Sequence, residues 1–200
     1  MAACVTEYFM SLPASGNVNE MTLSMKSNED QEEKESHLMS GEELIFLAES
    51  AGHERFWEYE GDIFMLFYNR FGTVPFMDIP DIAFMYMEIN NWQGMSVRCG
   101  VWQYYESGAF QDGKFERVMA YLRAHHEEEM ASVYALGIQD YANEIYQGNY
   151  DYPEEWFEGT DTIDEWIRDH EDHIYKWMYD LIMDHKKELL KTCGQGTKAR

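Results

Sequence analysis

The candidate functional residues of this chain are carboxylates that recur at helical spacing. From Thr162 to Lys191, apolar residues recur every three or four positions, which predicts one long helix with a buried face. Thr162 and Glu165 have the spacing of a capping box for its first turn. The acidic residues on its polar side are Asp161, Glu165, Asp169, Asp172, Asp180 and Asp184. Like charges at these steps repel by roughly a few tenths of a kcal/mol per pair. An anionic binding surface is the functional interpretation, and a solvated face on a core helix is the alternative.

A second acidic patch lies further back in the chain, directly after His125 and His126. Its residues are Glu127, Glu128 and Glu129. On the C-terminal helix, Lys176 lies four residues from both Asp172 and Asp180, and we expect it to weaken the negative field there. The two patches together are the predicted partner-binding residues.

Histidine and cysteine give weaker signals for catalysis. His170 and His173 stand in the stretch HEDH, which is not the HExxH motif of zinc proteases, and no Glu-x-x-His pair of the di-iron type occurs. Cys99 lacks the surrounding residues of known nucleophile motifs, and no phosphate-binding glycine loop is present. We therefore predict no catalytic residues, no metal and no cofactor. An enzyme that uses the histidines or Cys99 is the alternative of another class.

The charge balance restricts the kind of partner. Asp and Glu number 38 against 15 Lys and Arg, a formal net charge of -23, while hydrophobic residues make up 45% of the 200 positions. Such a charge disfavours direct binding to nucleic acid and to anionic membranes, because both need a cationic surface. Duplex DNA carries one charge per ~1.7 Å, so this charge corresponds to about 40 Å of duplex, which is about the diameter of a compact domain of this length. A basic partner is favoured.

The cysteines and the apolar runs bear on the compartment. Cys4, Cys99 and Cys193 are widely spaced and form no CxxC motif, which favours a reducing, cytoplasmic setting. We expect no signal peptide, because the N-terminus lacks a basic region followed by a long apolar one. No apolar run approaches the ~20 residues of a membrane span.

The elements that position these residues are predicted to be helices throughout. Ser40 and Glu43 form a capping box and Gly52 closes the first helix. Further helices are expected at about 54–70, 81–92, 97–106, 114–126 and 127–146, with a break at Gly94. No strand-like alternation persists, so the fold class is all-α: a single compact multi-helix domain at 40–192. Residues 1–39 are expected to be a flexible acidic arm and 193–200 a C-terminal tail.

The segment Met87–Gly108, MEINNWQGMSVRCGVWQYYESG, resembles the signature of a bacterial DNA-mimic protein family. That pattern is an acidic-Asn helix end, a Gly-rich turn and an aromatic-Gln-aromatic-aromatic helix. The matching residues are Glu88, Asn90 and Asn91 for the first part and Trp102, Gln103, Tyr104 and Tyr105 for the last. The turn departs from the family, since MSVRC separates Gly94 from Gly100. The resemblance implies an all-helical, dimeric protein whose carboxylates replace DNA phosphates on the DNA-binding surface of a transcription factor.

The same motif also has a structural interpretation. Trp102 and Tyr105 would pack in the core, and Asn90 and Gln103 would hydrogen-bond across the turn. The dense aromatic cluster around Trp92 and Trp102 is predicted to be core, with a dimer interface as the alternative.

The sequence thus predicts a non-enzymatic, cytoplasmic acidic protein. It would form a homodimer, bind the basic surface of a DNA-binding protein and compete with DNA. The second hypothesis is an immunity protein that neutralises a basic toxin such as a nuclease.

Overall fold

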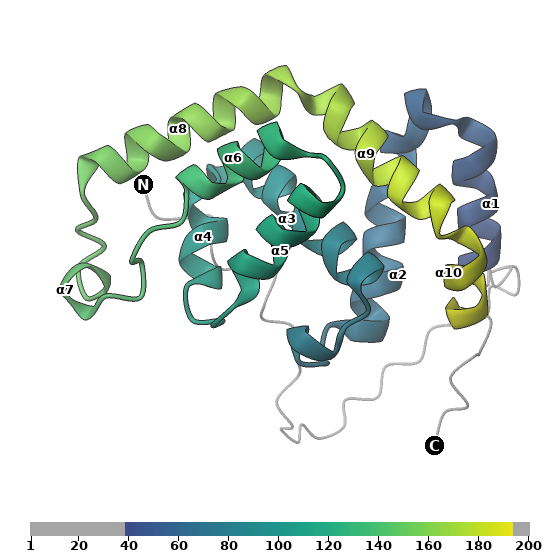
Figure 1. The fold of residues 1–200 in the computed structure, drawn as a ribbon, viewed down its shortest axis with the longest axis horizontal. Helices are drawn as coiled ribbons and strands as arrows, with labels where there is room; N and C mark the ends of the chain where they lie inside the picture. Colours follow the sequence, from purple (N-terminus) through teal and green to yellow (C-terminus); the bar gives the residue numbers. More distant parts are fainter. Residues whose placement is uncertain (1–38, 194–200) are drawn as a thin grey trace, which may run out of the picture. The chain divides into compact units, whose positions relative to one another are not determined.

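A computed structural model describes residues 39–193, and within this range the chain is helical with no β-strand. The all-α prediction is confirmed. The predicted arm and tail lie outside the described residues, except for Met39 and Cys193 at their inner ends. The elements are α1 Gly41–Ala51, η1 His53–Glu58, α2 Glu60–Phe71, η2 Phe76–Asp78, α3 Asp81–Cys99, α4 Trp102–Gly108, α5 Lys114–Ala124, α6 Glu128–Leu136, α7 Glu144–Gln147, α8 Glu154–Asp169, α9 Glu171–Asp184 and α10 Lys186–Cys193 (Figure 1).

The start and end of α1 follow the predicted local chemistry. The Glu43 backbone N–H donates to Ser40 Oγ at 3.2 Å, and the Ser40 N–H donates to Glu43 Oε2 at 2.9 Å. This is the capping box, and it satisfies donors that an isolated helix end would leave unpaired. Gly52 follows the helix with φ 74°, a backbone region that glycine adopts without steric cost.

The single helix predicted for 162–191 is wrong, because three helices occupy this stretch. The helix is interrupted after Asp169 and again after Asp184, and His170 and His185 are the C-cap residues. Thr162 is not an N-cap. It lies inside α8, and its hydroxyl donates to the Glu158 carbonyl at 3.2 Å.

Two predicted helix boundaries were wrong because the role of a glycine was misassigned. Gly94 does not break a helix, since α3 continues through it to Cys99, and Gly100, with φ 89°, ends that helix. The helix predicted at 97–106 is therefore wrong, and α4 occupies Trp102–Gly108 instead. The helix predicted at 127–146 is interrupted at Gly137, and the one predicted at 54–70 is divided into η1 and α2.

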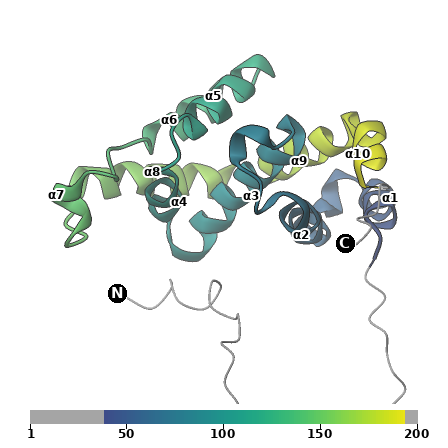
Figure 2. The same ribbon diagram turned by 90° about the horizontal axis from the view of Figure 1, so that it is seen from below.

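Helix α3 is central to the core. It contacts α2, α4, α5, α8 and α9, and it lies between α2 and α4 in both views (Figures 1 and 2). Every residue from Ile82 to Met87 is buried, so α3 has no wide polar face in its first half. None of the described helices is long and apolar enough to cross a bilayer.

The aromatic cluster is core. Trp92, Tyr104, Tyr105 and Tyr134 are fully buried, and their polar atoms are joined by hydrogen bonds. Trp92 Nε1 donates to Tyr105 Oη at 2.8 Å, and Tyr105 Oη donates to the Tyr134 carbonyl at 2.8 Å. The Tyr104 and Tyr134 hydroxyls bond each other at 2.8 Å. Buried aromatic polar groups with satisfied partners fix one packing arrangement.

The hydrogen bond predicted between Asn90 and Gln103 does not form. Asn90 Nδ2 donates to the carboxylate of Glu60 in α2 instead. Trp102 is only partly buried, and its ring makes a T-shaped contact with Phe157 of α8. The resembling segment thus supplies core residues between α3, α4 and α8.

Candidate functional site

Helix α8 begins where proline favours a helix start and ends at a histidine. Pro153 is the N-cap, and Glu154 and Glu155 occupy the first turn, where carboxylates interact favourably with the helix dipole. Thr160, Ile163 and Ile167 form its buried face. In Figure 1, α8 runs along one edge of the helical assembly, in contact with α3 and α6.

The opposite face of α8 carries a line of carboxylates, which we call the α8 stripe. Its members follow at steps of four, three, four and four residues, so they stay on one side of the helix. All are exposed: Glu154, Glu158, Asp161, Glu165 and Asp169. They span about 22 Å at ~1.5 Å per residue. No ion pair joins any of them to another described side chain.

Asp164 belongs to α8 but not to the stripe. Its carboxylate accepts the Val101 backbone N–H at 3.0 Å, and so it holds the turn between α3 and α4. Burial raises the pKa of this carboxyl, although hydrogen bonds from Ser96 and Val101 act in the opposite direction. Its role is structural, and the sequence analysis did not single it out.

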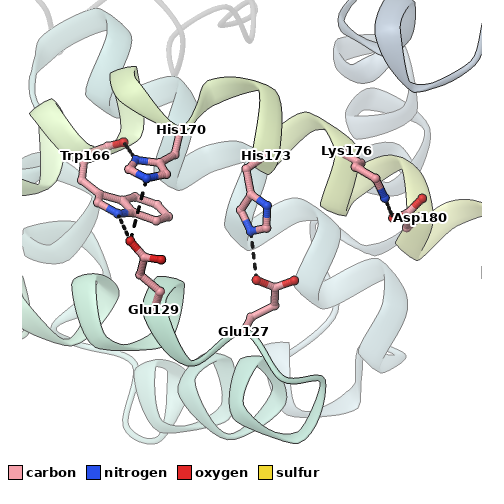
Figure 3. A network of polar contacts seen from close by, with 7 residues as sticks. All are labelled: Glu127, Glu129, Trp166, His170, His173, Lys176 and Asp180. Atoms are coloured by element: carbon pink, nitrogen blue, oxygen red, sulfur yellow. Dashed lines mark hydrogen bonds and ion pairs between the residues drawn. The ribbon is translucent and has the colours of Figure 1, made fainter.

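The predicted acidic residues of the C-terminal stretch are divided between two helices. Asp161, Glu165 and Asp169 are brought together on the α8 stripe, whereas Asp172, Asp180 and Asp184 belong to α9. Asp180 forms an ion pair with Lys176, the residue that was expected to weaken the negative field there (Figure 3). Asp172 and Asp184 are exposed.

Two stripe residues, Glu154 and Glu158, were missed by the sequence analysis. The signal was present, because the three- and four-residue spacing of carboxylates continues upstream of Asp161. It was overlooked because the helix was predicted to start at Thr162. The Pro153-Glu154-Glu155 sequence is itself a helix-start pattern.

The second acidic patch faces the junction between α8 and α9. Glu127 is the N-cap residue of α6, and its Oε2 accepts from His173 Nε2 at 2.9 Å. Glu129 Oε1 accepts from Trp166 Nε1 at 3.1 Å and lies 3.8 Å from His170 Nε2 (Figure 3). Glu128 is exposed. Glu127 and Glu129 thus connect helices as well as adding charge to the surface.

The histidines of this region are not arranged around a common point. His170 and His173 face different carboxylates, and among residues 39–193 no three His, Cys, Asp or Glu side chains are positioned to hold a metal ion. Cys99 is the last residue of α3 and is half-buried.

Comparison with protein-family models, curated proteins and solved structures finds no match for this chain.

Proposed function

We propose that this protein is a non-enzymatic acidic binding protein whose α8 stripe engages the basic surface of a DNA-binding protein and competes with DNA. One observation carries the proposal: five exposed carboxylates lie in line on a helix, opposite its buried face and without ion-pair partners among the described residues. The proposed activity needs no cofactor and no direct contact with nucleic acid or membrane.

The stripe has an electrostatic cost that a basic partner would relieve. Adjacent carboxylates at these steps repel one another, and Arg168 is the one cationic residue within α8. Lysine and arginine side chains of a partner bound along the helix would attract these carboxylates and offset the repulsion between them. A field of one sign also speeds encounter with an oppositely charged partner.

The spacing of the carboxylates determines the spacing of negative charge that a partner's basic surface must match. Along the stripe a charge occurs every ~5–6 Å, which is sparser than the ~3.4 Å of one DNA strand. One helix therefore does not reproduce a duplex. Glu128 of α6 and Asp172 and Asp184 of α9, all exposed, supply additional negative charge.

The test uses the protein as bait in a lysate of the cells that produce it, at low salt, with duplex DNA as the eluting competitor. Neutralising the stripe with Glu158→Gln, Asp161→Asn and Glu165→Gln should weaken retention of a basic DNA-binding protein by about 3- to 150-fold, at ~0.2–1 kcal/mol per lost exposed pair. The matched control neutralises three exposed carboxylates of other elements: Glu54→Gln, Asp62→Asn and Asp78→Asn. Both variants change the net charge equally, so only position differs.

The outcomes separate the hypotheses. Equal retention by both triple variants would remove the α8 stripe from the proposal. Capture of a basic toxin that duplex DNA does not release would favour the immunity hypothesis instead. Reversing Glu165 and Asp169 to Lys should abolish binding while leaving helicity intact, as circular dichroism would show.

Homodimer formation stays a prediction. If it occurs, the stripe should lie outside the dimer interface, because two such stripes repel each other. Sedimentation of the native protein and of the stripe variant should then give the same association state.

A further inference from the structure

Three helices of this protein end in the same way. The histidine that caps each one places Nδ1 at 2.8–3.0 Å from the carbonyl oxygen four residues earlier. The pairs are His125 with Tyr121 in α5, His170 with Trp166 in α8, and His185 with Leu181 in α9. A carbonyl only accepts, so Nδ1 carries the hydrogen, and Nε2 of the neutral ring carries none.

At His170 this assignment has an electrostatic consequence. The ring stacks on Trp166 with centroids 4.3 Å apart, and its Nε2 faces Glu129 Oε1 at 3.8 Å (Figure 3). In the neutral ring a nitrogen lone pair faces a carboxylate, which is a contact between two acceptors. Protonation places an N–H there, so the contact becomes an ion pair only when the imidazole is charged.

A second pair lies beside the first. His173 Nε2 donates to Glu127 Oε2 at 2.9 Å, and protonation of the other ring nitrogen would make this bond charge-assisted. Both histidines flank the α8–α9 break, and both carboxylates stand at the start of α6. Proton uptake by either ring therefore acts on the same junction.

We propose that His170–Glu129 and His173–Glu127 form a proton-dependent clasp between α6 and the α8–α9 junction. The nearby charges on α9 are Lys176, which is within electrostatic reach of Glu127, and Glu171 and Asp172 in its first turn, and α8 ends with Arg168 and Asp169. From α3 the junction meets uncharged groups, Trp92 against Trp166 and Gln93, which donates to Glu171 at 3.4 Å.

The direction of the effect follows from the pairing. Imidazoles gain their second proton between about pH 8 and pH 5. An imidazolium pairs with a facing carboxylate more strongly than a neutral ring does, so the clasp is stronger where the rings are charged than where they are neutral. The clasp is a property of the free protein and does not depend on the proposed binding partner.

The test is a double-mutant cycle between positions 170 and 129, measured by denaturant unfolding at about pH 8 and about pH 5.5. The variants are His170→Gln, Glu129→Gln and the double substitution. The amide introduced by Glu129→Gln keeps an oxygen for Trp166 Nε1, so this change removes charge more than hydrogen bonding. We expect no favourable coupling at the higher pH and a favourable coupling of about 1.5- to 5-fold in the unfolding equilibrium constant at the lower one.

His125→Gln is the matched control. His125 has the same capping bond and the same stacking, with Tyr121 at 4.0 Å, but no described carboxylate pairs with it. It therefore reports the effect of a charged histidine at a helix end alone. A coupling of equal size at both pH values would overturn the clasp. It would also be overturned if His125→Gln and His170→Gln lost the same amount of the extra stability measured at the lower pH.

Discussion

Lys114 is a buried cation, and its removal should be among the most damaging single changes outside the apolar core. The residue is 5% exposed, and its Nζ lies 2.9 Å from Glu88 Oε2 and 5.0 Å above the Tyr104 ring. Glu88 also accepts the Tyr104 hydroxyl at 2.7 Å. This pair connects α3, α4 and α5 beneath the surface.

The Lys114→Met substitution keeps most of the side-chain volume but leaves the Glu88 carboxylate without its cation. The Glu88 side chain is only 14% exposed, so water compensates poorly. Breaking a buried ion pair costs about 3–5 kcal/mol, against a total stability of ~5–15 kcal/mol for an ordinary domain. Changing Glu88 to Met as well should restore part of the loss, since replacing both charges is often neutral or stabilising, whereas the buried Tyr104 hydroxyl loses its acceptor.

The assay is chemical denaturation followed by circular dichroism, with the free energy of unfolding compared at constant m-value. Lys176→Met is the control, because it removes the same charge from a side chain that is 54% exposed and paired with Asp180. Its cost should stay below about 1 kcal/mol. If Lys114→Met costs no more than Lys176→Met, the argument from burial is refuted.

Five further substitutions should change stability in directions that the structure determines. Glu60→Gln should stabilise the protein at neutral pH, because burial raises the pKa of this carboxyl and makes its charged form costly. The folded state holds the proton more tightly than the unfolded state, so the cost of the charge grows as pH rises. The stabilisation by Glu60→Gln should therefore disappear on acidification, which unfolding measured across pH would show. Gly94→Ala should stabilise α3 by about 0.5–1 kcal/mol, because no heavy atom lies within 4 Å of the added carbon. Gly137→Ala should destabilise the protein by about 1–3 kcal/mol, because the added carbon would meet the Tyr105 ring at 2.1 Å. Thermal melts of the two glycine variants would test the opposite directions of these stability changes. Tyr141→Phe should be nearly neutral in the same melts, because this buried hydroxyl has no hydrogen-bond partner among the described residues, whereas Tyr105→Phe loses two buried hydrogen bonds and should cost about 1–3 kcal/mol.

The parts of the fold that the sequence predicted are those with local chemistry. The Ser40 cap and the Gly52 end depend on residues a few positions apart, so their types and spacing were sufficient. The breaks at His170 and His185 could not be predicted in this way. Histidine is neither a strong helix former nor a breaker, and apolar spacing continues across both positions. The break at His170 is accompanied by stacking on Trp166 and a bond to its carbonyl.

The candidate site was predicted in part for the same reason. The stripe follows from helical periodicity, which is visible in sequence once the helix start is placed correctly. The second patch is different, because Glu129 meets Trp166 across 37 residues and Glu127 meets His173 across 46. Such contacts are set by the packing of α6 against α8, and no pattern of spacing contains them.

The carboxylate face of α8 determines which chemistry can map a complex of this protein. Residues 124–167 contain no lysine or arginine, so reagents that join one lysine amine to another have nothing to react with there. A carbodiimide, which activates carboxylates, would couple Glu158 or Glu165 directly to a lysine of a bound partner. Trypsin cleaves on either side of this stretch, after Arg123 and Arg168, so four of the five stripe residues would be recovered in one long peptide.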